Sequence, residues 1–162
     1  MTLTTAQKTT LAADIRANTD PDVVAALAVR GDADIAMLYN LPSAFAVYQS
    51  SVSLKQIGES LDYSNVADLT SANNERLNVF RAYNDESADP RRVDIRAFFD
   101  DVFSGAQGTE TRANLALLWQ RIATIAEEIF ATGAGTQGNP GALVFEGQLS
   151  ANDVGEALNE NP

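Results

Sequence analysis

The stretch TETRANLALLWQRIATIAEEIFA, Thr109 to Ala131, carries the strongest secondary-structure signal in the chain. Its apolar residues recur at spacings of three and four, which is the period of a helix with one buried face. They are Leu115, Leu118, Trp119, Ile122, Ala126, Ile129 and Phe130. The pattern predicts one long amphipathic helix that Gly133 ends as a C-terminal cap. We interpret Trp119 and the neighbouring aromatic residues as core.

Beyond this helix the sequence changes to a glycine-rich loop, TGAGTQGNPG, at residues 132–141. The apolar run ALVFE at 142–146 predicts a short strand, and Ser150 with Asp153 predicts the cap of a final helix. A helical body, a flexible tether and a short apolar segment are typical of a chain that docks onto a sheet edge or a groove. We therefore expect a helical body at 1–131 and an arm at 132–162. The arm residues expected to bind a portal protein or a neighbouring subunit are Leu143, Val144, Phe145, Glu146 and Leu149.

The arm has an alternative position. Segments joined by a short connection usually pack against each other, so it can also fold back onto its own body. Docking elsewhere is the interpretation we favour here, and resistance of residues 135–141 to proteolysis would indicate the alternative.

Capping signals divide the rest of the chain into shorter helices. The residues that open them are Thr4 (with Gln7), Asp20 (before Pro21), Asp32, Ser53, Thr70 or Ser71, and Asp89 (before Pro90). Leu77, Phe80 and Tyr83 form one apolar face, while Phe45 and Val47 alternate as in an extended segment. The predicted fold is mainly α: a helical bundle with one or two short β segments and an extended C-terminal arm.

Composition restricts the possible functions. The 162 residues suffice for one domain with a hydrophobic core, and 45% of them are hydrophobic. The chain has no Cys and no His, which removes disulfides, thiolate nucleophiles, the usual zinc sites and imidazole catalysis. A formal net charge of −11 disfavours binding to nucleic acid. No signal peptide is recognisable and no apolar run approaches the roughly 20 residues that cross a bilayer. We expect a soluble protein without a membrane partner.

Two motifs that suggest chemistry have simpler explanations. The run Gly133-Ala-Gly135-Thr-Gln-Gly138 spells a dinucleotide-binding pattern, but that mechanism needs a strand before the glycines and a helix after them. Here the expected order is reversed. Neighbouring carboxylates such as Glu127 and Glu128 point about 100° apart on a helix and do not converge on one ligand. We expect no catalytic residue, no cofactor and no metal; a small enzyme with a carboxylate site is the remote alternative.

Arg91 and Arg92 stand in the first turn of a predicted helix, with Arg96 after them, and Asp100 and Asp101 stand in its last turn. Both placements oppose the helix dipole by about 0.3–1 kcal/mol per charge. A solvated face can tolerate that cost. The sharper interpretation is a head-to-tail contact between subunits, in which the Arg end of one copy meets acidic surface on the next.

The order of these motifs resembles a family of tailed-bacteriophage virion proteins encoded among the head and head–tail joining genes. The resemblance covers roughly two thirds of the chain, and Tyr48 and Tyr63 stand where the family tends to have Trp. The matching segments are Pro42 with Phe45-x-Val47-Tyr48-x-x-x-Val52 and Ile57; Pro90 through Arg96, Phe99 and Phe103-x-Gly105; Arg121-x-Ala-Thr-x-x-Glu127; Ala131-Thr-Gly-x-Gly-Thr136 and Pro140; Phe145-Glu-Gly-x-Leu-Ser150; and Asp153-Val154-x-x-Ala157.

The resemblance implies a structural role rather than an enzymatic one. Members look like head–tail adaptor proteins, also called connector or head-completion proteins. Such a protein forms a ring, commonly of twelve copies, under the portal. The ring extends the DNA channel, lets DNA pass without specific binding, and docks the next neck or tail protein. The expected location is the virion neck, after synthesis in the host cytoplasm. Tail completion or capsid decoration is the alternative role.

Overall fold

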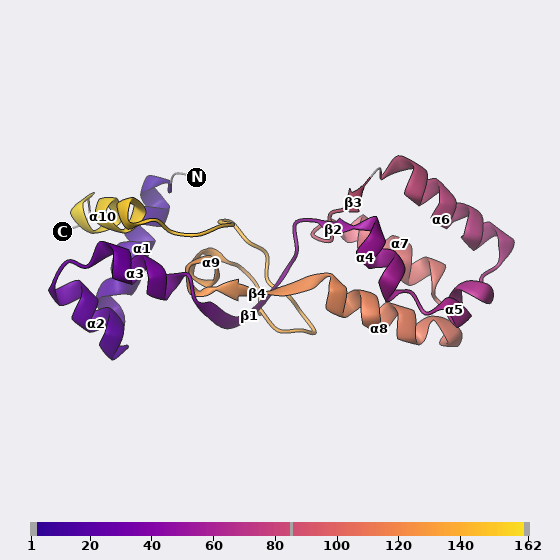
Figure 1. Ribbon diagram of the computed structural model, residues 1–162, viewed down its shortest axis with the longest axis horizontal. Helices are drawn as coiled ribbons and strands as arrows, with labels where there is room; N and C mark the ends of the chain where they lie inside the picture. The colour runs from indigo at the N-terminus through magenta and orange to yellow at the C-terminus, as the bar shows by residue number, and fades with distance from the viewer. Residues whose placement is uncertain (1–2, 85, 161–162) are drawn as a thin grey trace. The chain divides into compact units, whose positions relative to one another are not determined.

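A computed structural model describes residues 3–84 and 86–160 of the chain. The fold is mainly α with a few short strands, as the sequence predicts (Figure 1). The chain forms two compact units. The terminal unit comprises Met1–Val47 and Ile122–Pro162, and the inserted unit comprises Tyr48–Arg121. These boundaries do not coincide with the predicted division into a body at 1–131 and an arm at 132–162.

The terminal unit is built from both ends of the chain. Its helices are α1 (Thr5–Ala17), α2 (Pro21–Ala28), α3 (Asp32–Tyr39), α9 (Ile125–Phe130) and α10 (Ala151–Glu160). Helix α10 packs against α1 and α3. The most buried core residues include Leu11, Ile15, Ile35, Tyr39, Val154 and Leu158.

Local capping signals set most helix starts in this unit. Thr4 and Gln7 form the predicted capping box of α1, and Asp20 accepts the N–H of Asp22 at the start of α2. Ser150 and Asp153 exchange the hydrogen bonds expected before α10. The exception is α3, whose N-cap is Gly31, with Asp32 as its first helical residue.

The inserted unit is one continuous segment of chain. It contains α4 (Leu54–Ser60), α5 (Tyr63–Ala67), α6 (Ser71–Tyr83), α7 (Val93–Val102), a 3-10 turn (Ala106–Gly108) and α8 (Thr109–Leu118). Strands β2 (Val52–Ser53) and β3 (Ser87–Ala88) pair in an antiparallel register, Val52 opposite Ala88. Phe99 contacts Phe80, Phe98 and Trp119, with ring centroids 5.0, 5.2 and 5.5 Å apart. The interpretation of Trp119 as core is confirmed, since it is 4% exposed.

The single long helix predicted over 109–131 is wrong. Helix α8 ends at Leu118, a strand β4 (Gln120–Thr124) follows, and α9 starts at Ile125. The break falls where β-branched Ile122 and Thr124 favour an extended backbone. Thr124 also caps α9 in a capping box with Glu127, so the helix is restarted by its own N-terminal signal.

The chain passes between the units along two strands. Strand β1 (Pro42–Tyr48) leaves the terminal unit and β4 returns to it, and the two strands form a two-stranded sheet. The predicted extended segment around Phe45 and Val47 is therefore confirmed. Within the inserted unit, Gln49 holds the strand ends together, because its backbone N–H donates to the Trp119 carbonyl at 2.8 Å. In the described part of the chain, no helix has the length and apolar character needed to span a membrane.

Candidate functional site

The glycine-rich loop at 132–141 is bound to its own unit rather than free. The Ala46 N–H donates to the Gly135 carbonyl at 2.7 Å, and the Gly141 N–H donates to the Ala46 carbonyl at 2.8 Å. Thr132 and Ala142 exchange backbone hydrogen bonds of 2.9 and 2.8 Å. The loop thus lies along β1, and its expected role as a flexible tether does not match this placement.

The glycines of the loop make room for one aromatic ring. A Cβ added at Gly135 would lie 2.0 Å from the Phe45 ring, and one added at Gly141 would lie 2.2 Å from it. Gly135 also has a φ of 63°, a left-handed conformation that disfavours other residues. Within the run that spells a dinucleotide pattern, Gly135 is therefore the glycine that the packing of Phe45 requires.

Two of the predicted partner-binding residues lie in the core of their own unit. Phe145 is 3% exposed and meets Phe130 edge to face at 5.5 Å. Leu149 is 4% exposed, and its backbone exchanges hydrogen bonds of 2.9 and 2.8 Å with the Asn40 side chain. This burial does not fit their expected binding to another molecule, because their apolar surface is already removed from water within their own chain. The arm takes the alternative position, folded back onto the body.

The other three residues predicted to bind a partner are at least partly accessible. Val144 is 64% exposed, while Leu143 and Glu146 are partly buried. The predicted strand at 142–146 is not formed, since only Ala142 makes a β-bridge there. Partner binding through Leu143, Val144 and Glu146 stays a prediction.

Glu127 fixes the folded-back segment and was missed as a key residue. It is 3% exposed; its Oε2 accepts the Thr124 N–H at 2.9 Å, and its Oε1 accepts the Gly147 N–H at 3.1 Å. One carboxylate thus caps α9 and holds the turn after Phe145. The spacing Thr124-x-x-Glu127 is the capping-box signal that could have identified half of this role.

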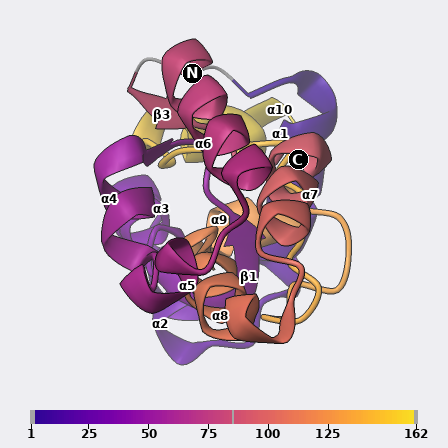
Figure 2. The same cartoon turned by 90° about the vertical axis from the view of Figure 1, so that its right-hand side faces the viewer.

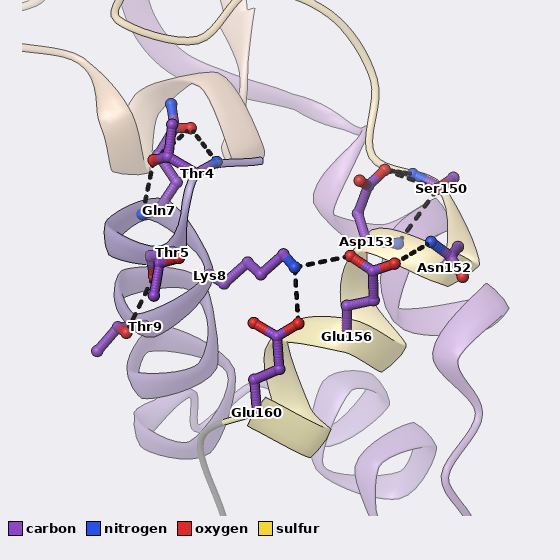
Figure 3. A network of polar contacts seen from close by, with 10 residues as sticks. All are labelled: Thr4, Thr5, Gln7, Lys8, Thr9, Ser150, Asn152, Asp153, Glu156 and Glu160. Carbon is purple, nitrogen blue, oxygen red and sulfur yellow. Dashed lines mark hydrogen bonds and ion pairs between the residues drawn. The ribbon is translucent and has the colours of Figure 1, made fainter. Parts of the chain in front are cut away.

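A second polar clamp joins the two ends of the chain (Figure 3). The Lys8 Nζ of α1 lies 2.8 Å from carboxylate oxygens of both Glu156 and Glu160 on α10. The Lys8 ammonium donates hydrogen bonds to these carboxylates, which raises the pKa of Lys8 and lowers the pKa of Glu156. No sequence pattern links residues this far apart, and the clamp fits a structural role.

The arginines predicted at a subunit contact are paired locally. Helix α7 begins at Val93, so Arg91 and Arg92 precede it and the first-turn placement is wrong. Arg91 binds Asp89 at 2.9 Å and Arg92 binds Asp94 at 2.5 Å. These hydrogen bonds lower the pKa of both carboxyl groups.

The other members of that predicted contact are spread over the inserted unit. Arg96 donates to the Pro90 carbonyl, and its guanidinium lies 3.9 Å from the centroid of the Tyr48 ring. Asp101 binds Arg76 of α6 at 2.7 Å, and Asp100 is exposed. A contact of these residues with another copy stays a prediction.

Helices α6 and α7 of the inserted unit are labelled in Figure 2. The inserted unit carries an open apolar hollow of about 530 Å³, lined by residues of these two helices. The two helices pack through Phe80, whose ring stacks on Phe98 at 5.0 Å. Tyr83 is 85% exposed, so it does not share the buried face predicted for it with Leu77 and Phe80. The apolar hollow is lined by Ala72, Glu75, Arg76, Val79, Phe80, Tyr83 and Phe98.

The terminal unit has an exposed apolar face of its own on α2. Val24 and Val29, the C-cap of α2, are 49% and 76% exposed, and Ala25 and Ala28 beside them are exposed as well. We call these four residues the α2 outer face. Val23 and Ala26 on the opposite side are buried in the core. A helix that is apolar all round is normally covered on both sides, so the α2 outer face is a candidate contact surface.

The described residues hold no cluster of three or more metal-ligating acidic side chains. The apolar hollow and the α2 outer face are two exposed apolar areas, one on each unit, and exposed apolar patches often mark contact surfaces. No family model, no curated protein and no solved structure matches this chain.

Proposed function

We propose that the protein is a non-enzymatic head–tail adaptor of a tailed phage, which assembles into a ring under the portal. The observation that carries the proposal is that one chain exposes two different apolar surfaces, the apolar hollow and the α2 outer face. Such surfaces favour burial against a partner. When the two surfaces of a contact differ, identical copies join head to tail and close into a ring if the rotation allows.

The distribution of charge supports assembly without DNA binding. The terminal unit carries eleven acidic and three basic residues, and the inserted unit carries eleven acidic and eight basic ones. Their formal charges are thus −8 and −3. Because both charges are negative, the gain in a contact between copies comes from burial of apolar surface and not from the net charges. An acidic channel wall would repel the DNA backbone and let it pass.

The resemblance to phage neck proteins suggests which proteins the ring would contact. Leu143, Val144 and Glu146 lie within the folded-back segment and remain at least partly accessible, and we propose that they contact the portal or a neighbouring subunit. The downstream neck or tail protein would bind the opposite rim of the ring. In this proposal the segment stays packed on its own unit while these exposed side chains contact the partner.

The proposal is tested by imaging the full chain alone and mixed with the portal protein encoded in the same genome. We expect closed rings in negative-stain images, commonly of twelve copies, that stack coaxially on the portal. Mass photometry of the same samples checks the copy number. A chain that stays monomeric with portal and never binds it would refute the adaptor role, and co-purification with tails or capsid shells would indicate one of the alternative virion roles.

A further inference from the structure

We draw no further inference here: the strongest candidate, the open apolar hollow beside α6 and α7 of the inserted unit, carries none because nothing in the structure shows what covers it.

Discussion

The cores of the two units are assembled from different parts of the chain. The terminal unit joins residues from opposite ends of the chain: Lys8 binds Glu156 and Glu160, and Asn40 binds the backbone of Leu149. The inserted unit, residues 48–121, closes around aromatic rings supplied by one continuous segment. The difference implies that the terminal unit depends on a complete C-terminus, whereas the inserted unit carries its whole core within itself.

Deleting residues 131–162 should have the largest effect and should affect one unit only. The terminal unit would lose Phe145, Leu149, Val154 and Leu158 from its core. Each buried side chain of this kind contributes about 1.5–3 kcal/mol, so the loss is comparable to the stability of a whole domain. We expect the terminal unit to unfold and the inserted unit to remain folded.

The single tryptophan makes this deletion easy to interpret. Trp119 lies in the core of the inserted unit, so its fluorescence reports that unit alone. Its emission should keep a buried spectrum and a cooperative thermal transition, while circular dichroism loses helix signal. A truncated chain with the full helix content expected for its remaining residues would contradict the dependence on the C-terminus.

Phe145→Ala should destabilise the terminal unit by about 3–5 kcal/mol, because it removes a buried ring that packs on Phe130. Val144→Ala is the matched control on the next residue. Val144 is 64% exposed, so that change should stay within about 0.5 kcal/mol. Urea unfolding followed by circular dichroism measures both. Equal effects would mean that the arm is not packed as the structure places it.

Gly135→Ala should destabilise the same unit by about 1–3 kcal/mol, because it overpacks the Phe45 ring and strains a backbone with a φ of 63°. Gly138→Ala in the same loop is the control, since a Cβ there meets nothing within 4 Å. Combining Gly135→Ala with Phe45→Ala should cost less than the sum of the two changes, as expected for residues in direct contact. Additive losses would show that the ring and the loop are independent.

Lys8→Met should reduce the dependence of the terminal unit's stability on extreme pH. The pKa of Lys8 is raised above its ordinary 10.5, so its contribution is complete below pH 10.5 and is lost as pH rises beyond that value. The pKa of Glu156 is lowered from 4.5, so its contribution is complete above pH 4.5 and is lost as pH falls. Melting temperatures across pH should fall at both ends in the natural chain and less in the variant. Identical profiles would show that the clamp adds no stability.

Exchanging Arg91 and Arg92 for Glu should have the smallest effect on folding. Both side chains are exposed and form ion pairs with Asp89 and Asp94, and exposed ion pairs add little to the free energy of unfolding, so the loss should be small. A clear loss of self-association by the well-folded variant would support the predicted head-to-tail role of these arginines. Unchanged assembly would remove them from the contact and leave the apolar hollow as the remaining candidate contact surface of the inserted unit.

The comparison of the units also shows what could be anticipated at the candidate site. The capping box Thr124-x-x-Glu127 was legible in the sequence, but the second hydrogen bond of Glu127, to Gly147, joins residues 20 positions apart. The exposure of Tyr83 could not be foreseen, because helical spacing places it on the same face as Phe80 and does not say where the helix leaves the core. Hollows on the surface arise where secondary-structure elements pack against each other, so no short stretch of sequence predicts them.

The sequence by itself determined the mainly α character and the helix starts at Thr4, Asp20 and Ser150, because capping and helical period depend on residues three or four positions apart. Only the tertiary structure decided how the apolar residues of 109–131 are divided between the cores of the two units. Leu115 and Trp119 enter the core of the inserted unit, and Ala126 and Phe130 enter that of the terminal unit. Periodicity shows which residues share one buried face. It does not show that residues 120–124 form a strand, because β4 is held extended by pairing with β1, which is far away in the sequence.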